Sequence, residues 1–252
     1  MVVTTIPYEE RPQRNMANTA RTEPLPELGD FPSLGESMVR LGFQSPAPSP
    51  IMRLPLEIHE KIWKETMLLE LGNDPAIRVR NYIKSPATRP GFLPKSLLIS
   101  KMVLREMHPV FVRLITFRTN SIGDNEYLRR YLDLPNGGRH NVRSLRFDFF
   151  DCFPLGLPIN HDLALATSCK GLTTIQITLH WSRVHRTVDE IVSHYHLKKV
   201  LDCKSLTTFN LAKKGDFREE EEDKILMLAS WVECAFQAQG QVVTCHVFPY
   251  RR

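Results

Sequence analysis

The stretch at residues 172–177 reads Leu172-Thr173-Thr174-Ile175-Gln176-Ile177, and its pattern returns along the chain. The same frame, Leu-Thr-Thr-Φ-x-Φ with Φ an apolar residue, recurs at 206–211, 34 residues later. A looser copy stands at 142–147, 30 residues before the first stretch, and another at 242–247, 36 residues after the second. Apolar residues that alternate with polar ones over a short run are typical of β-strands. We therefore predict one short strand in each of four copies.

Helical patterns fill the intervals between these copies. They lie at about 127–132, 162–166, 188–201 and 219–238. A strand and a helix that recur every 30 to 36 residues indicate stacked βα units with right-handed crossovers and a parallel sheet. Residues 116–120 are a candidate for one further strand before the first copy.

The predicted βα body resembles the leucine-rich-repeat solenoid. His180 and Lys214 stand where that family has its ladder asparagine, so the resemblance implies an irregular solenoid with degenerate repeats. The fold class that we predict is α/β, with short parallel strands and helices over residues 114–252.

A second informative stretch, residues 54–67, reads Leu-Pro-Leu-Glu-Ile-His-Glu-Lys-Ile-Trp-Lys-Glu-Thr-Met. Proline suits the first turn of a helix, where its missing N–H has no partner in any case, so a helix is predicted to begin at Pro55. One apolar stripe is expected along this helix. It comprises Ile58, Ile62 and Leu69, with Trp63 and Met67 beside them.

The pattern Leu-Pro-x-Glu-Ile-x-x-x-Ile at 54–62 resembles the opening of an F-box, and residues 96–111 resemble the second half of the F-box-like region in a large group of fungal proteins. The resemblance implies that the first helix docks a Skp-type adaptor of a cullin-RING ubiquitin ligase, while the body recruits a substrate protein of unknown identity. The adaptor-binding residues that it implies are Leu54, Pro55, Ile58, Ile62 and Trp63. The alternative is an intracellular scaffold without a ubiquitin role, whose first helix only caps the solenoid.

The predicted organisation has three parts. Residues 1–50 form a Pro-rich tail whose composition cannot offset its chain entropy, so disorder is expected there. Residues 51–113 form the F-box-like helical region, in which a polar stretch at about 71–95 is inserted and brackets a candidate strand at 78–83. The second helix is expected from about 95 to 113, shortened or bent near Pro109, and the body follows at 114–252.

The composition and the net charge limit the classes of protein to which this chain could belong. At 252 residues and 42% hydrophobic content the chain can bury a core, and its net charge of +5 alone selects no partner. It has no long apolar run and no signal-peptide pattern at its start, so we expect an intracellular protein, in cytoplasm or nucleus, without membrane attachment. The odd number of cysteines, five in all, suits reduced thiols.

No phosphate-binding, dinucleotide-binding, zinc-protease or serine-hydrolase motif occurs in the sequence. We therefore expect a non-enzymatic protein with no cofactor. The histidines of His194-Tyr195-His196 would point apart on a helix, so no metal site is expected there.

Two groups of residues are candidates for partner binding. Trp181 and Arg183 follow a predicted strand, which suits either an exposed contact or burial under the next helix. Asp148 and Asp151 lie where another strand ends, an edge at which parallel sheets bind ligands, or else they simply cap the loop. Arg139, Arg143 and Arg146 could line one face, but without a reader motif nucleic-acid binding is not expected.

Overall fold

The computed structural model describes residues 54–72, 75–80, 90–134, 138–152, 157–180, 182, 184 and 187–250. The predicted tail at 1–50 therefore lies outside the described residues. The described chain is an α/β structure with a single six-stranded sheet in which every neighbouring pair is parallel. The strands follow one another in chain order across the sheet: β1 (Ala76–Arg78), β2 (Thr116–Thr119), β3 (Ser144–Phe147), β4 (Thr174–His180), β5 (Thr208–Lys214) and β6 (Thr244–Pro249).

Helices connect the strands. The α-helices are α2 (Leu56–Leu71), α3 (Lys101–Leu114), α4 (Ile122–Leu132), α5 (His161–Ser168), α6 (Val188–His194) and α7 (Glu219–Gln237). Short 3₁₀ turns add η2 (Lys95–Leu98), η3 (Arg139–Asn141), η4 (Phe150–Cys152) and η6 (Leu197–Asp202). Among the described residues, no helix combines the length and apolar character needed to cross a membrane.

The sequence frame coincides with the strand register. The first Φ position of each copy pairs with the next, from Leu145 to Ile175 to Phe209 to Cys245. The prediction that the four copies form adjoining parallel strands is confirmed. The extra strand predicted at 116–120 is also present as β2, whose Phe117 lies opposite Leu145.

The repeated threonines tie each unit to the one before it. The hydroxyl of Thr173 donates to the carbonyl of Arg143 at 3.0 Å, and that of Thr207 donates to the carbonyl of Thr173 at 3.2 Å. The backbone N–H groups of Thr173 and Thr207 reach the same two carbonyls. Each threonine therefore doubles the bonding at the point where a strand begins.

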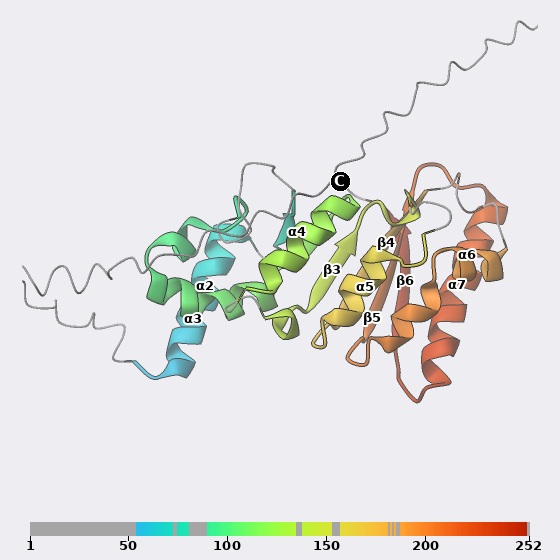
Figure 1. Cartoon of the computed structure of the whole chain (residues 1–252). Helices are drawn as coiled ribbons and strands as arrows, with labels where there is room; N and C mark the ends of the chain where they lie inside the picture. The colour runs from blue at the N-terminus through green and yellow to red at the C-terminus, as the bar shows by residue number, and fades with distance from the viewer. Residues whose placement is uncertain are drawn as a thin grey trace, which may run out of the picture. The chain divides into compact units, whose positions relative to one another are not determined.

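The two faces of the sheet differ in what they carry. Because the strands run in chain order with crossovers of one hand, their helices lie on one face, and Figure 1 shows α4 and α5 in front of the strands. The Φ side chains, such as Ile175 and Phe209, are buried on that side. The residues between them, Arg146, Gln176 and Asn210 among others, are on the other side, which we call the open face.

The pair α2 and α3 shares one hydrophobic core with the sheet, which extends from Trp63 to Val243. Its buried stripe on α2 is His59, Trp63 and Met67, spaced by four residues. The predicted stripe was therefore partly wrong, because Ile58 is 38% exposed and Leu69 is 88% exposed. The two stripes differ by one residue, or 100° around the helix, and the larger Trp63 faces the core.

Two boundaries in this region differ from the prediction. The second helix divides into η2 and α3, since Ser100 caps α3 by accepting a hydrogen bond from the N–H of Val103 at 3.1 Å. Helix α3 then continues through Pro109 to Leu114. The candidate strand at 78–83 shares only Arg78 with β1, which covers Ala76–Arg78; Val79 and Arg80 are not part of a strand, and residues 81–89 lie outside the described residues.

Candidate functional site

The five residues of the F-box-like pattern divide between surface and interior. Leu54 is 41% exposed, and Pro55 and Ile58 also lie on the surface at the start of α2. Ile62 is half-buried against the core and Trp63 is only 9% exposed. The indole N–H of Trp63 has no hydrogen-bond partner among the described residues. The surface part of the pattern is therefore its first turn.

A hollow of about 360 Å³ lies between α2 and α3. Its lining residues are mostly charged: Glu57, Glu60, Lys61, Lys64, Val110, Arg113 and Leu114. Arg113 Nη2 donates to Glu60 Oε1 at 2.9 Å, which ties the start of α2 to the end of α3. Leu54 and Ile58 do not belong to this lining.

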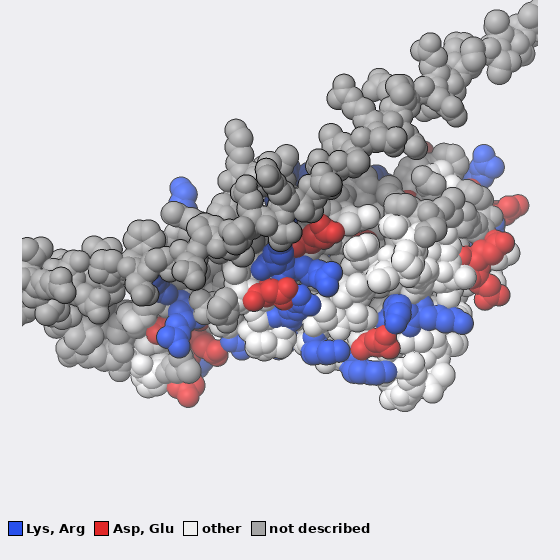
Figure 2. Space-filling model, viewed as in Figure 1, with Lys and Arg blue, Asp and Glu red and all other residues white. Residues whose placement is uncertain are grey.

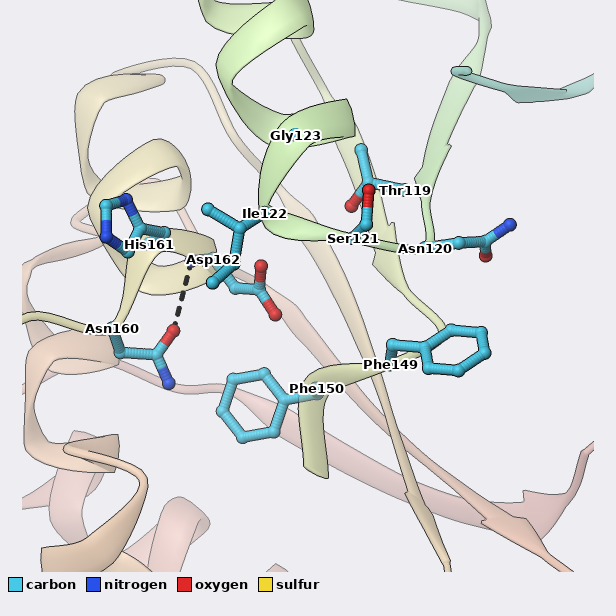
Figure 3. A pocket seen from close by; sticks show the side chains of 10 residues that line it. All are labelled: Thr119, Asn120, Ser121, Ile122, Gly123, Phe149, Phe150, Asn160, His161 and Asp162. Carbon is cyan, nitrogen blue, oxygen red and sulfur yellow. Dashed lines mark hydrogen bonds between the residues drawn. The ribbon is translucent and has the colours of Figure 1, made fainter. Parts of the chain in front are cut away.

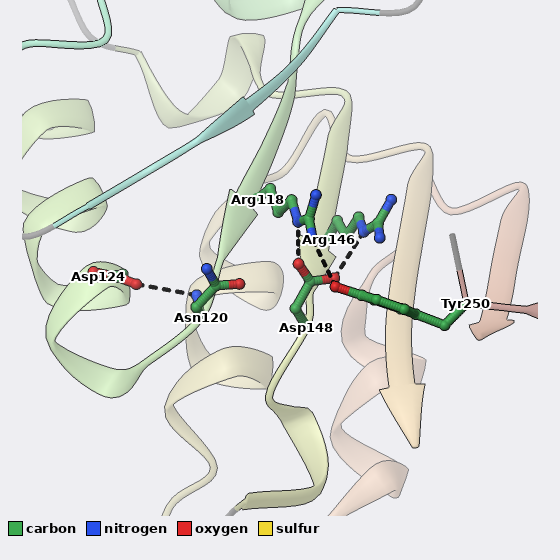
Figure 4. A network of polar contacts seen from close by, with 6 residues as sticks. All are labelled: Arg118, Asn120, Asp124, Arg146, Asp148 and Tyr250. Carbon is green, nitrogen blue, oxygen red and sulfur yellow. Dashed lines mark hydrogen bonds and ion pairs between the residues drawn. The ribbon is translucent and has the colours of Figure 1, made fainter. Parts of the chain in front are cut away.

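On the open face, the carboxylate of Asp148 holds two arginines from neighbouring strands (Figure 4). It accepts a hydrogen bond from Arg118 Nε and another from Arg146 Nε, the latter at 2.8 Å, and the residue is only 2% exposed. Burial acts to lower the pKa of Arg118, but the hydrogen bond and charge of Asp148 raise it above its ordinary value. Arg118 is thus half-buried and forms a charge pair with the buried Asp148.

The network around Asp148 extends to Tyr250 at one end and to Asn120 and Arg78 at the other. Arg118 Nη2 donates to the hydroxyl of Tyr250 at 2.6 Å, so the end of the chain reaches back to β2. When the Asn120 amide is oriented to satisfy both its ends, it donates to Asp148 Oδ2 at 3.1 Å and accepts from Arg78 Nη2 at 2.5 Å. The backbone N–H of Asn120 donates to Asp124 Oδ2 at 3.1 Å.

Arg78, Arg118 and Arg146 are neighbours in strand register, and we call them the arginine row. The ring of Tyr250 lies beside this row, with the guanidinium carbon of Arg118 at 5.8 Å and that of Arg146 at 5.2 Å from its centroid. Lys214 Nζ lies 5.7 Å from the same ring and 4.9 Å from the ring of Phe149. These distances suit cation–π contacts.

The sequence-based candidates at this edge occupy different environments. Asp148 belongs to the arginine network, whereas Asp151 is buried and its Oδ2 accepts from the N–H of His180 at 2.8 Å, at the end of β4. Trp181 and Arg183 lie outside the described residues.

The idea that Arg139, Arg143 and Arg146 line one face was wrong. Arg139 pairs with Asp133, and Arg143 Nη1 donates to the carbonyl of Gly171 at 3.0 Å. Their side chains are held by local partners beside η3, so Arg146 alone of the three contacts Asp148.

A pocket of about 380 Å³ opens where β2 and β3 end, between the first turns of α4 and α5 (Figure 3). Phe149 and Phe150 form an apolar wall, and the polar lining includes Ser121, Asn160 and Asp162. Neither Asp148 nor Asp151 lines it. Burial raises the pKa of Asp162 to about 7, while a hydrogen bond from Asn125 acts in the opposite direction.

The helix ends that border this pocket are already capped. Ser121 Oγ accepts from the N–H of Asp124 at 3.1 Å, and Asn160 Oδ1 accepts from the N–H groups of Asp162 and Leu163. Within the described chain, no group of three or more His, Cys, Asp and Glu side chains is arranged to hold a metal ion.

Comparisons with protein-family models, with curated proteins and with solved structures all ended without a match. The F-box-like and leucine-rich-repeat-like resemblances therefore rest on the sequence patterns, and the site rests on its geometry.

The sequence interpretation missed Arg78, Arg118 and Tyr250 as members of one site. Part of the signal was present, because Phe117-Arg118-Thr119 matches Leu145-Arg146-Phe147 once the strands are aligned by their frame. Tyr250 gave no such signal, since its contact with Arg118 spans 132 residues.

Proposed function

We propose that this chain is a non-enzymatic protein-interaction protein with F-box-like helices and a leucine-rich-repeat-like body. In this proposal the start of α2 docks a Skp-type adaptor, and the body recruits a second protein for ubiquitination. The observation that carries it is the exposure of Leu54, Pro55 and Ile58 at the start of a helix that Trp63 and Met67 anchor in the core.

Exposed apolar side chains on a rigid helix suit docking, because they lose little conformational freedom when a partner covers them. Full burial of a leucine or isoleucine side chain contributes roughly 1.5–3 kcal/mol, so the partly exposed Leu54 and Ile58 would each contribute about 1 kcal/mol. A stable complex buries far more surface than these residues offer, so further contacts from the adaptor are part of the proposal.

The body supports the solenoid part of the proposal. Its strands lie in chain order, and all are parallel and share one register. Among the described residues, such stacking places the connecting helices on one face of the sheet, and repeat proteins use the other face for binding.

The alternative is an interaction protein without a ubiquitin role. The inward packing of Ile62 and Trp63 favours it, because a helix that only caps the core needs this packing and no adaptor. The two functions differ in whether the first turn of α2 binds anything.

The test is a binding measurement between the purified full chain and a purified Skp-type adaptor. The double variant Leu54→Ala/Pro55→Ala and the single variant Ile58→Asp are expected to weaken binding at least about tenfold, since each removes or charges the docking surface. Leu69→Asp is the matched control, because Leu69 is an exposed leucine on the same helix outside the first turn.

Wild-type binding that Leu69→Asp preserves and Ile58→Asp abolishes would support adaptor docking. The absence of adaptor binding by the wild-type chain would overturn it in favour of the alternative. Equal losses in Ile58→Asp and Leu69→Asp would also overturn it, since the first turn would then have no special role.

A further inference from the structure

We propose that the arginine row on the open face binds an acidic peptide segment of the recruited protein. This inference deepens the proposed function, on which it rests for the recruiting role of the body, by naming the chemical class of the partner. It is carried by three features of the described residues: a run of like charges, two unpaired polar groups and an aromatic ring among cations.

Like charges in adjacent register oppose folding. Arg78, Arg118 and Arg146 occupy facing positions on three successive strands, which lie about 5 Å apart. Asp148 offsets part of the repulsion by pairing with Arg118 and Arg146. A local arrangement that works against stability is a common mark of a binding site.

The charge distribution differs between the two faces. On the helix-covered face, basic and acidic side chains are interspersed (Figure 2). In the open-face network, Lys214 lies near Tyr250 and joins the three cations of the arginine row, while Asp148 supplies the carboxylate. A cluster of one sign attracts and orients a partner of the opposite sign.

Two polar groups on β4 extend the row. Gln176 pairs with Arg146 in register, and its Nε2 is buried without a hydrogen-bond partner in the described part of the chain. Thr178 lies two residues further along the strand and is 1% exposed. Its hydroxyl group is also buried without a hydrogen-bond partner among the described residues. Buried polar groups are nearly always bonded, so an unpaired donor beside arginines favours a ligand rich in acceptor oxygens.

Asp148 already shows the chemistry that the site prefers. Guanidinium groups bind carboxylates with shape as well as charge, and Arg118 and Arg146 share one carboxylate here. Arg78 is exposed and bonds the neutral amide of Asn120, so its charge is not balanced by that contact. A glutamate or aspartate from a partner would supply the balancing charge.

The size of the site favours a peptide over a nucleic acid. Affinity for nucleic acid rises with the number of phosphates that basic side chains neutralise, and two of the four cations in the arginine row with Lys214 already pair with Asp148. The rings of Tyr250 and Phe149 are already beside cations, which leaves them poorly placed to stack on bases. An extended peptide places alternate side chains about 7 Å apart, a spacing that long arginine side chains can span.

The experiment measures fluorescence anisotropy of a short labelled peptide of alternating Glu and Ser with the purified full chain, without adaptor. The same peptide with Gln in place of Glu and a single-stranded DNA of equal net charge serve as comparisons. The acidic peptide is expected to bind, the Gln peptide is not, and binding should weaken as salt rises from about 0.05 to 0.2 M.

Arg78→Gln is the test variant, because Arg78 is exposed and is not one of the two arginines whose ion pairs with Asp148 the structure shows. It should weaken binding about tenfold. Arg78→Glu should abolish binding. Lys199→Gln is the matched control, since Lys199 is an exposed cation on η6, and it should change affinity less than about twofold.

No binding of the acidic peptide would overturn the proposal, and so would equal effects of Arg78→Gln and Lys199→Gln. Tighter binding of the DNA than of the peptide would replace it with a nucleic-acid site. Because this assay contains no adaptor and the adaptor assay changes only residues 54–69, a failure of one proposal is distinguishable from a failure of the other.

Discussion

Asp162 shows how a single half-buried carboxyl group couples proton binding to folding. Its pKa is raised from 3.8 to about 7, first because burial disfavours the charged form. The folded chain therefore holds this proton more tightly than the unfolded chain. The contribution of Asp162 to stability consequently falls as the pH rises from about 4 to about 7 and levels off above that.

Asp162→Asn is expected to remove this loss, because asparagine keeps the shape and can still accept the hydrogen bond from Asn125. Each unit of pKa shift corresponds to about 1.4 kcal/mol, so the gain over wild type should grow to on the order of 2 kcal/mol or more by about pH 8. Urea unfolding across this pH range measures it. Asp223→Asn, on the exposed side of α7, controls for the loss of one negative charge, and a gain for Asp162→Asn that stays constant with pH would contradict the prediction.

The role of Asp148 could be only half predicted from its position. Its place after a strand was correct, because the frame fixes where β3 ends. Its partners could not be predicted, since Arg118 precedes it by 30 residues and reaches it through a long flexible side chain. The local sequence pattern predicts toward which face of the sheet the Asp148 side chain points. Its contact with Arg118 depends in addition on which strand lies next to β3.

At the scale of one element, β6 shows how the sheet ends. The N–H groups of Thr244 and Tyr250 donate to the carbonyls of Thr207 and Lys213, so the backbone N–H side of the alternate residues Cys245, Val247 and Pro249 faces away from β5. Glu233 Oε1 accepts from the N–H of Cys245 at 2.8 Å, and Pro249 has no N–H to offer. Within this described strand, the N–H of Val247 is left as the outward donor, which limits pairing with another chain.

The double variant Glu233→Ala/Pro249→Ala restores an outward row of donors and is expected to promote self-association. Light scattering should give a higher mean mass than wild type at the same concentration, while stability changes by only about 1 kcal/mol because the edge is solvent-exposed. Gln237→Ala, exposed on the same helix as Glu233, is the control. Equal masses for the double variant and wild type would show that these two residues do not protect the edge.

Helix α2 shows that the spacing of apolar residues can predict a helix without predicting which of its faces is buried. Its apolar residues suit two stripes offset by one position, and both have the spacing of a helix face. The choice between them depends on what the helix packs against, and α3 and the core lie on the side of Trp63 and Met67. The existence of the helix was therefore predictable, and its orientation was not.

At the scale of the molecule, side chains pack across the predicted boundary at residue 113 between the helical region and the body. Phe92 and Phe111, which precede it, contact aromatic rings that follow it: the ring centroids of Phe92 and Tyr131 are 5.2 Å apart, and those of Phe111 and Phe117 are 6.4 Å apart. Strand β1 also pairs with β2 from the other side of the division. The frame predicted the parallel body well, and turn residues indicated a strand near residue 78, but no local signal predicted that this strand would pair with β2.

A fragment ending at Leu114 is therefore expected not to fold by itself, since it would expose Phe92 and Phe111 and leave β1 without its neighbour. Its proton NMR spectrum should show the narrow dispersion of an unfolded chain, with the full chain as the control. A well-dispersed spectrum from the fragment would show that the helical region is an independent domain.

The coincidence of sequence frame and strand register has an evolutionary corollary. Deleting or duplicating one complete period, 30 to 36 residues, rejoins equivalent positions and keeps every apolar side chain pointing inward. An indel of one residue inside a strand would instead turn the remainder of that strand inside out. Descendants of such a chain should therefore differ in length by whole periods, with smaller changes confined to the turns.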